Sequence, residues 1–109
     1  MTTTNRANVP HPAGATDVHD WVDLETDMPF RCFDGSWWVV ERPERGEDID
    51  VHIAGTQHHD GSITRDIAVH ELHADHPLTI KQARELGAAL IAAADEAEQR
   101  ARYDRITVS

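Results

Sequence analysis

The chain has 109 residues, enough for one domain, and its formal charge of −10 comes from 20 acidic and 10 basic residues. This balance argues against nucleic-acid binding, for which basic residues supply most of the affinity. The single cysteine, Cys32, excludes an internal disulfide, and no segment is apolar enough for a signal peptide or a membrane span, so we expect a cytoplasmic protein without membrane contact.

The N-terminal part divides into two segments. Residues 1–16 are small and polar with two prolines, which predicts a disordered tail. Residues 17–29 form an acidic-aromatic segment in which Val18, Trp21 and Val22 have helical spacing. This spacing predicts a short amphipathic turn that folds back on the domain. The alternative is a partner-binding motif, with Asp20, Trp21 and Asp23 as its contacts.

The sheet-plus-helix domain is predicted over residues 30–103. A short strand at 30–32 precedes Asp34-Gly35, a hairpin signal, and a second strand follows at 36–41. Alternation along this second strand gives it two apolar faces, with Trp38 and Val40 on one of them. One face can receive a helix, whereas the other needs residues 17–29, a second subunit or a partner to cover it. We expect Trp38 and Val40 to bind the partner, and Trp38 to be the exposed aromatic anchor.

Other residues of this region have simpler interpretations. Cys32 is expected to be a small buried hydrophobe, because no base lies near it in the sequence. Arg42 and Arg45 flank an acidic loop and are interpreted as solubilising surface residues.

Residues 49–57 and 62–72 are predicted to form two antiparallel strands. A three-residue loop, 59–61, sets Val51 opposite Val69 and Ile53 opposite Ile67, which pairs apolar with apolar side chains. It also places Gly61 at the left-handed position typical of such loops. The apolar face should receive the helix, and the opposite face should be solvated.

A C-terminal helix is predicted from Leu78 to about Arg102. Thr79 and Gln82 have the spacing of a capping box. Its expected buried stripe comprises Ile80, Ala83, Leu86, Gly87, Leu90, Ile91, Ala94 and Ala97. Residues 104–109 are interpreted as a tail or an edge strand. The predicted fold is therefore α+β, a three- to four-stranded antiparallel sheet with one C-terminal helix packed on one face.

Histidine is the one over-represented functional residue type. Of eight histidines, six lie between positions 52 and 76. His52, His70, His73 and His76 are the candidate ligands of a shared metal, although scattered surface histidines need no ligand. The sequence H-E-L-H at 70–73 is one residue short of the metalloprotease motif and lies at a strand end. We assign no catalytic residue and no cofactor.

The stretches I-A-G-T-Q-H-H-D-G-S-I-T-R-D-I-A-V and L-T-I-K-Q-A-R-E-L-G-A-A-L-I-A-A-A-D-E-A resemble a group of small uncharacterised proteins of actinobacteria and their phages, mycobacteriophages especially. The resemblance covers residues 49–98. The resemblance supplies neither an enzymatic activity nor site residues. A phage origin would make a host protein the partner.

The expected function is a small, acidic, non-enzymatic protein-interaction module, with a homodimer as a further option. The first alternative is a nucleic-acid mimic that inhibits a DNA-binding protein, which requires carboxylates arrayed along one surface and salt-sensitive binding. The second is a histidine-based metal-binding protein.

Overall fold

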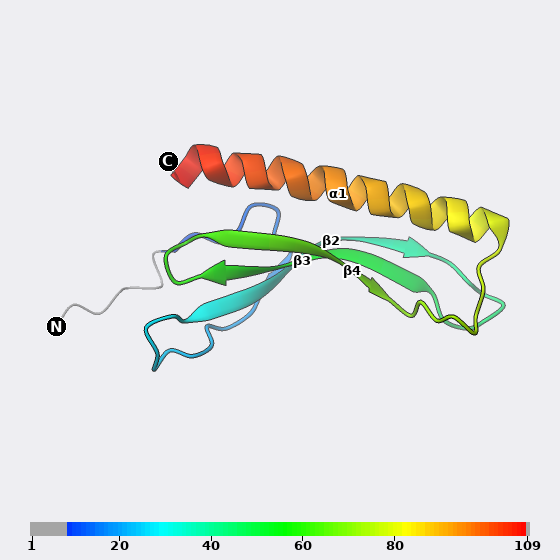
Figure 1. Cartoon of the computed structure of the whole chain (residues 1–109), viewed down its shortest axis with the longest axis horizontal. Coiled ribbons are helices and arrows are strands. Elements are labelled where there is room, and N and C mark those ends of the chain that lie inside the picture. The colour runs from blue at the N-terminus through cyan, green and yellow to red at the C-terminus, as the bar shows by residue number, and fades with distance from the viewer. Residues whose placement is uncertain (1–8, 109) are drawn as a thin grey trace.

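The computed structural model describes residues 9–108, with side chains described for residues 9–104. Four strands form one antiparallel sheet in the order β1-β2-β3-β4, and a single helix lies along one face (Figure 1). The elements are β1 (Asp17–Val18), β2 (Phe30–Val40), β3 (Ile49–His58), β4 (Ile63–His70) and α1 (Ile80–Val108). The predicted α+β fold is confirmed.

Strands β3 and β4 pair in the predicted register. Val51 lies opposite Val69 and Ile53 opposite Ile67. The amide of His58 donates to the carbonyl of Ser62, which closes the three-residue loop, and Gly61 has a φ of 90°. Pattern and turn chemistry agree here, and together they fix the register.

Strand β2 differs from the prediction. The two short strands and the turn expected between them form one continuous strand with a bulge between Asp34 and Trp37. Asp34 pairs with Ala54 and Trp37 pairs with His52, so two residues of β2 oppose the single Ile53. The extra residue reverses the alternation of β2, as a β-bulge does. Asp34 and Trp37 therefore point to the same face although they are three residues apart.

Helix α1 begins as predicted but ends later. The Thr79 hydroxyl accepts a hydrogen bond from the Gln82 amide at 3.1 Å, and the Gln82 side-chain oxygen accepts one from the Thr79 amide at 3.0 Å. This reciprocal pair confirms the capping box. The helix continues to Val108, so residues 104–108 are neither a tail nor an edge strand. Ser109 lies outside the described residues.

The buried stripe of α1 is rotated from the predicted one. The buried positions are Gln82, Leu86, Ala89 and Ala93, whereas Ile91 is 65% exposed. Small alanines let the helix lie close to the sheet, where they pack with Trp38, Val40, Ile49, Val51, Ile53, Ile67 and Val69. The prediction favoured the stripe with larger side chains, and the structure instead buries the narrower one.

Polar side chains cover the core where β2 and β4 begin and β3 ends. Gln57 accepts a hydrogen bond from Arg31 at 2.7 Å and donates one to the Pro10 carbonyl at 2.8 Å. Arg65 forms an ion pair with Asp104 of α1 and donates to the Ala13 carbonyl. These bonds hold residues 9–13 against the domain, which corrects the predicted disorder for that part of the tail. Residues 1–8 lie outside the described residues.

Arg42 closes the opposite end of the core. Its side chain is completely buried and donates to the carbonyls of Glu47 and Glu71 at 3.2 and 2.8 Å. It thereby ties the loop after β2 to the residue that follows β4. The interpretation of Arg42 as a solubilising surface residue was wrong, while Arg45 is exposed as expected.

The close packing at Gly55 predicts a stability difference between two glycine substitutions. A Cβ at Gly55 would lie 2.4 Å from Phe33 Cζ and 2.5 Å from the Thr64 carbonyl oxygen, whereas a Cβ at Gly87 meets nothing within 4 Å. Gly55→Ala should therefore lower the free energy of unfolding by about 1–3 kcal/mol. Gly87→Ala should raise it by about 0.5–1 kcal/mol. Urea unfolding followed by circular dichroism measures both, and equal effects would contradict this packing.

The burial of Arg42 predicts a second contrast. Arg42→Ala leaves two loop carbonyls without their charged donor and should destabilise the protein by roughly 1.5–3 kcal/mol. Arg45→Ala removes the same charge from an exposed position and should change stability by no more than about 0.5 kcal/mol. Thermal unfolding of the two variants compares them directly; similar melting temperatures would place Arg42 at the surface.

Candidate functional site

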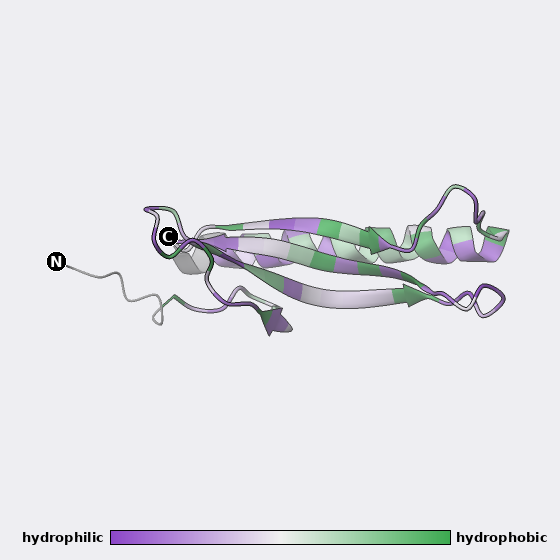
Figure 2. Cartoon of the chain, turned by 90° about the horizontal axis from the view of Figure 1, so that it is seen from below, coloured by the Kyte–Doolittle hydropathy of each residue, from purple (hydrophilic) through white to green (hydrophobic). Residues whose placement is uncertain are grey.

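The face of the sheet opposite α1 is uncovered. Figure 2 looks onto this face, and the strands lie in front of the helix with no other described element over them. We call it the open face. Its members follow from the strand register and comprise Asp17, Phe30, Cys32, Asp34, Trp37, Val39, Asp50, His52, Ala54, Thr56, His58, Thr64, Asp66, Ala68 and His70, with His19 directly after β1. No lysine or arginine is among these strand positions.

Trp37 and two histidines form a stack of rings across three strands. The ring centroids of Trp37 and His52 are 4.1 Å apart with an interplanar angle of 11°. The His52 and His70 centroids are 5.1 Å apart with an angle of 8°. Within this stack Trp37 stays 49% exposed, and Val39 beside it on β2 is 54% exposed. The open face therefore presents an ordered apolar surface.

Asp34 connects this stack to β1. Its Oδ1 lies 3.3 Å from His52 Nε2, and its Oδ2 lies 3.2 Å from His19 Nε2. His19 Nε2 is also 3.5 Å from Asp17 Oδ2. Because β1 and β2 place Asp17 directly opposite Asp34, two carboxylates and two imidazoles form one chain of contacts. None of these contacts was predicted, because the expected turn at Asp34 removed it from the sheet.

The four predicted metal candidates do not form one site. His52 and His70 lie together with their ring centroids 5.1 Å apart. His73 and His76 lie in the loop after β4 with their rings edge to face at a centroid distance of 5.8 Å. Among the described residues, ligand atoms converge instead at Asp17, His19 and Asp34, and at Glu47, Glu71 and His73.

The predicted exposed aromatic was the wrong tryptophan of the pair. Trp38 packs against the core, and Val40 is only 1% exposed, because the bulge turns both toward α1. Trp37 and Val39 occupy the uncovered face instead. The expectation that Cys32 is buried was also wrong, because β2 turns it to the open face.

The acidic-aromatic segment is extended rather than helical. Residues 17–18 pair with β2, and Val22 forms an isolated bridge with Phe30. The Arg31 guanidinium lies 4.6 Å from the centroid of the Trp21 ring, a cation–π arrangement. Asp20 and Asp23 are exposed at this edge of the sheet. A partner-binding role for Trp21, Asp20 and Asp23 stays a prediction.

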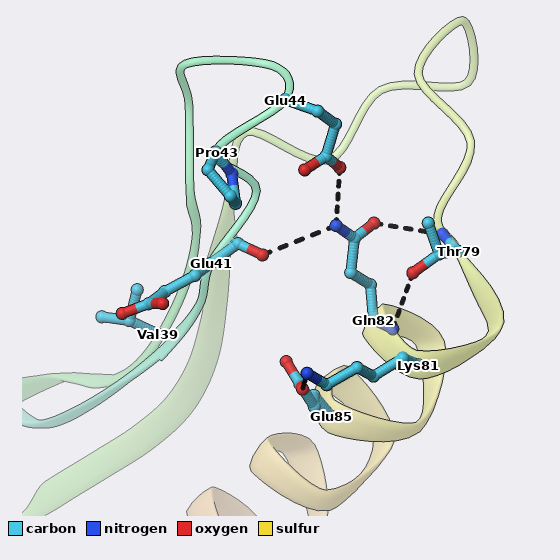
Figure 3. A pocket seen from close by; sticks show the side chains of 8 residues that line it. All are labelled: Val39, Glu41, Pro43, Glu44, Thr79, Lys81, Gln82 and Glu85. Carbon is cyan, nitrogen blue, oxygen red and sulfur yellow. Dashed lines mark hydrogen bonds and ion pairs between the residues drawn. The ribbon is translucent and has the colours of Figure 1, made fainter.

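A pocket of about 400 Å³ lies where α1 begins (Figure 3). The side-chain amide of Gln82 donates to the Glu44 carboxylate at 2.7 Å and points toward the Glu41 backbone carbonyl. The hydrogen bond from Gln82 is the main cause that lowers the pKa of Glu44. Because the pKa of Glu44 is lowered in the folded chain, its ionised carboxylate stabilises the fold at a pH above the ordinary pKa of glutamate. This stabilisation is lost as the pH falls through the lowered pKa. We interpret the hydrogen bonds of Gln82 in this pocket as contacts that hold the first turn of α1 against the loop after β2.

The outer side of α1 also carries exposed apolar side chains, including Ile80 and Ile91. They are the side chains that the rotation of the helix leaves outside the core. The predicted option of a homodimer stays a prediction.

No family model, curated protein or solved structure matches the chain. Although α1 has 29 residues, no helix in the described part of the chain is apolar enough over sufficient length to cross a membrane.

Proposed function

We propose that the protein is a small, non-enzymatic, cytoplasmic interaction module whose open face binds a basic segment of a partner protein. The observation that carries this proposal is the exposure of Trp37 and Val39 on a sheet face with no cationic strand residue. If the gene belongs to a phage, one of the two sources in the group that the sequence resembles, the partner would be a host protein.

The chemistry of the open face favours an arginine-rich partner. Each of the four strands contributes one aspartate to this face: Asp17, Asp34, Asp50 and Asp66. Carboxylates accept charge-assisted hydrogen bonds from guanidinium groups, and the face of a tryptophan attracts them by cation–π contact. Apolar contact with Trp37 and Val39 would supply affinity, while the acidic surroundings would select a cationic partner and accelerate its approach.

The same aspartates support a second candidate function, a nucleic-acid mimic. Such a protein needs carboxylates arrayed along one surface, and these four lie on one face of a sheet whose strands are about 4.8 Å apart. Its partner would be a DNA-binding protein, and duplex DNA would compete with it. An interaction module with another basic partner would be insensitive to that competition.

Titration with a labelled oligoarginine peptide, followed by fluorescence anisotropy, tests the assignment of the binding face. Trp37→Ser should weaken binding about tenfold, because it removes the exposed ring from the centre of the surface. The matched control is Ile91→Ser, which removes a comparably exposed apolar side chain from α1 and should leave the affinity unchanged.

Two double variants that remove the same charge distinguish binding at the open face from a general effect of the net negative charge. Asp50→Asn with Asp66→Asn should weaken peptide binding and reduce its salt dependence more than Asp75→Asn with Asp95→Asn, which removes two carboxylates elsewhere. Equal losses in the two double variants would mean that the peptide senses only the net charge. That result would overturn the assignment of the open face.

A further inference from the structure

We propose that Asp17, His19 and Asp34 bind one divalent transition-metal ion of the zinc class at the β1 edge of the sheet. His52 is the positioning residue behind Asp34. The site shares Asp17 and Asp34 with the open face, but zinc binding is measured without a partner peptide, so either proposal can fail without the other.

The distances between the three ligand atoms suit a metal ion. His19 Nε2 lies 3.2 Å from Asp34 Oδ2 and 3.5 Å from Asp17 Oδ2, and all three atoms lie within 4.8 Å of one another. Zinc bonds of about 2.0–2.2 Å in tetrahedral geometry place neighbouring ligands roughly 3.3–3.6 Å apart. The observed separations therefore leave room for an ion with little movement of the side chains.

The sheet fixes the positions from which these ligands project. Asp17 lies directly opposite Asp34, and the His19 amide donates to the Cys32 carbonyl, which extends the pairing beyond β1. Like charges directly opposite each other on neighbouring strands are destabilising. A divalent cation between the two carboxylates would turn this repulsion into attraction.

His52 is the second, independent observation. Its side chain is only 7% exposed, and its Nε2 lies 3.3 Å from Asp34 Oδ1, the oxygen on the far side of the carboxylate from His19. Its Nδ1 is buried with no hydrogen-bond partner in the described structure. The Nε2 contact with Asp34, and not the unpaired Nδ1 on the other side of the ring, connects His52 to the site. Outer-shell partners of this kind orient ligating carboxylates and tune metal affinity.

The donor set indicates the class of ion. One imidazole nitrogen and two carboxylate oxygens suit zinc and its first-row neighbours, whereas magnesium and calcium prefer oxygen ligands alone. Asp17 and His19 are more than half exposed, which leaves positions for water on the ion. The second cluster, Glu47, Glu71 and His73, consists of exposed residues only and supplies an internal control.

Zinc titration of the full chain without a polyhistidine tag tests the proposal, by calorimetry and by elemental analysis after dialysis. We expect one zinc ion per chain. His19→Ala should weaken binding at least tenfold, and His52→Gln about 10- to 100-fold, although His52 is not a ligand. His73→Ala should leave the affinity unchanged.

Histidine ring signals in NMR spectra of the wild-type chain give a readout that needs no variant. One equivalent of zinc chloride should shift the signals of His19 and leave those of His73 in place. The proposal is overturned if no stoichiometric zinc binds, if His73→Ala weakens binding as much as His19→Ala, or if the His19 signals do not move.

Discussion

The bulge in β2 is the constraint on which the rest of the structure depends. Gly35 and Ser36 together oppose Ile53, so the alternation of β2 changes phase between Asp34 and Trp37. Before the bulge, Phe33 faces the side of α1, and after it Trp38 and Val40 do. A regular strand would place either Phe33 or Trp38 on the solvent side. The bulge keeps both on the covered side and gathers Asp34, Trp37 and their histidine neighbours on the open face.

A narrow apolar core with polar ends explains how so small a chain covers one side of a long sheet. Alanines such as Ala89 and Ala93 bring α1 close to the strands in the middle of the sheet. At one end Arg42 donates to the carbonyls of Glu47 and Glu71, and at the other Arg31, Gln57 and Arg65 donate to the carbonyls of Val9, Pro10 and Ala13. Buried charged donors satisfy the backbone groups that loops bring into the interior. The helix therefore covers one face of the sheet, and the other face stays uncovered.

The features that the sequence predicted correctly are those set by turn and cap residues close together in the chain and by the apolar pattern of neighbouring strands. The β3–β4 register follows from a three-residue loop and from apolar pairs that match in only one alignment, and the helix start follows from a capping box. Asp34-Gly35 was misleading because the same dipeptide suits a hairpin and a bulge, and only the long-range pairing with β3 distinguishes them. That one difference concealed the Asp17–His19–Asp34 cluster. The burial of Arg42 and of residues 9–13 likewise depends on contacts between distant segments.

The surface hypotheses share one premise, that the bulge exposes Trp37 and covers Trp38. Oxidative footprinting of the native protein measures this directly, because tandem mass spectrometry resolves modification at adjacent tryptophans. The structure predicts rapid modification of Trp37 and protection of Trp38 until the protein unfolds. Preferential modification of Trp38, or equal rates at the two positions, would contradict the bulge and the open face built upon it.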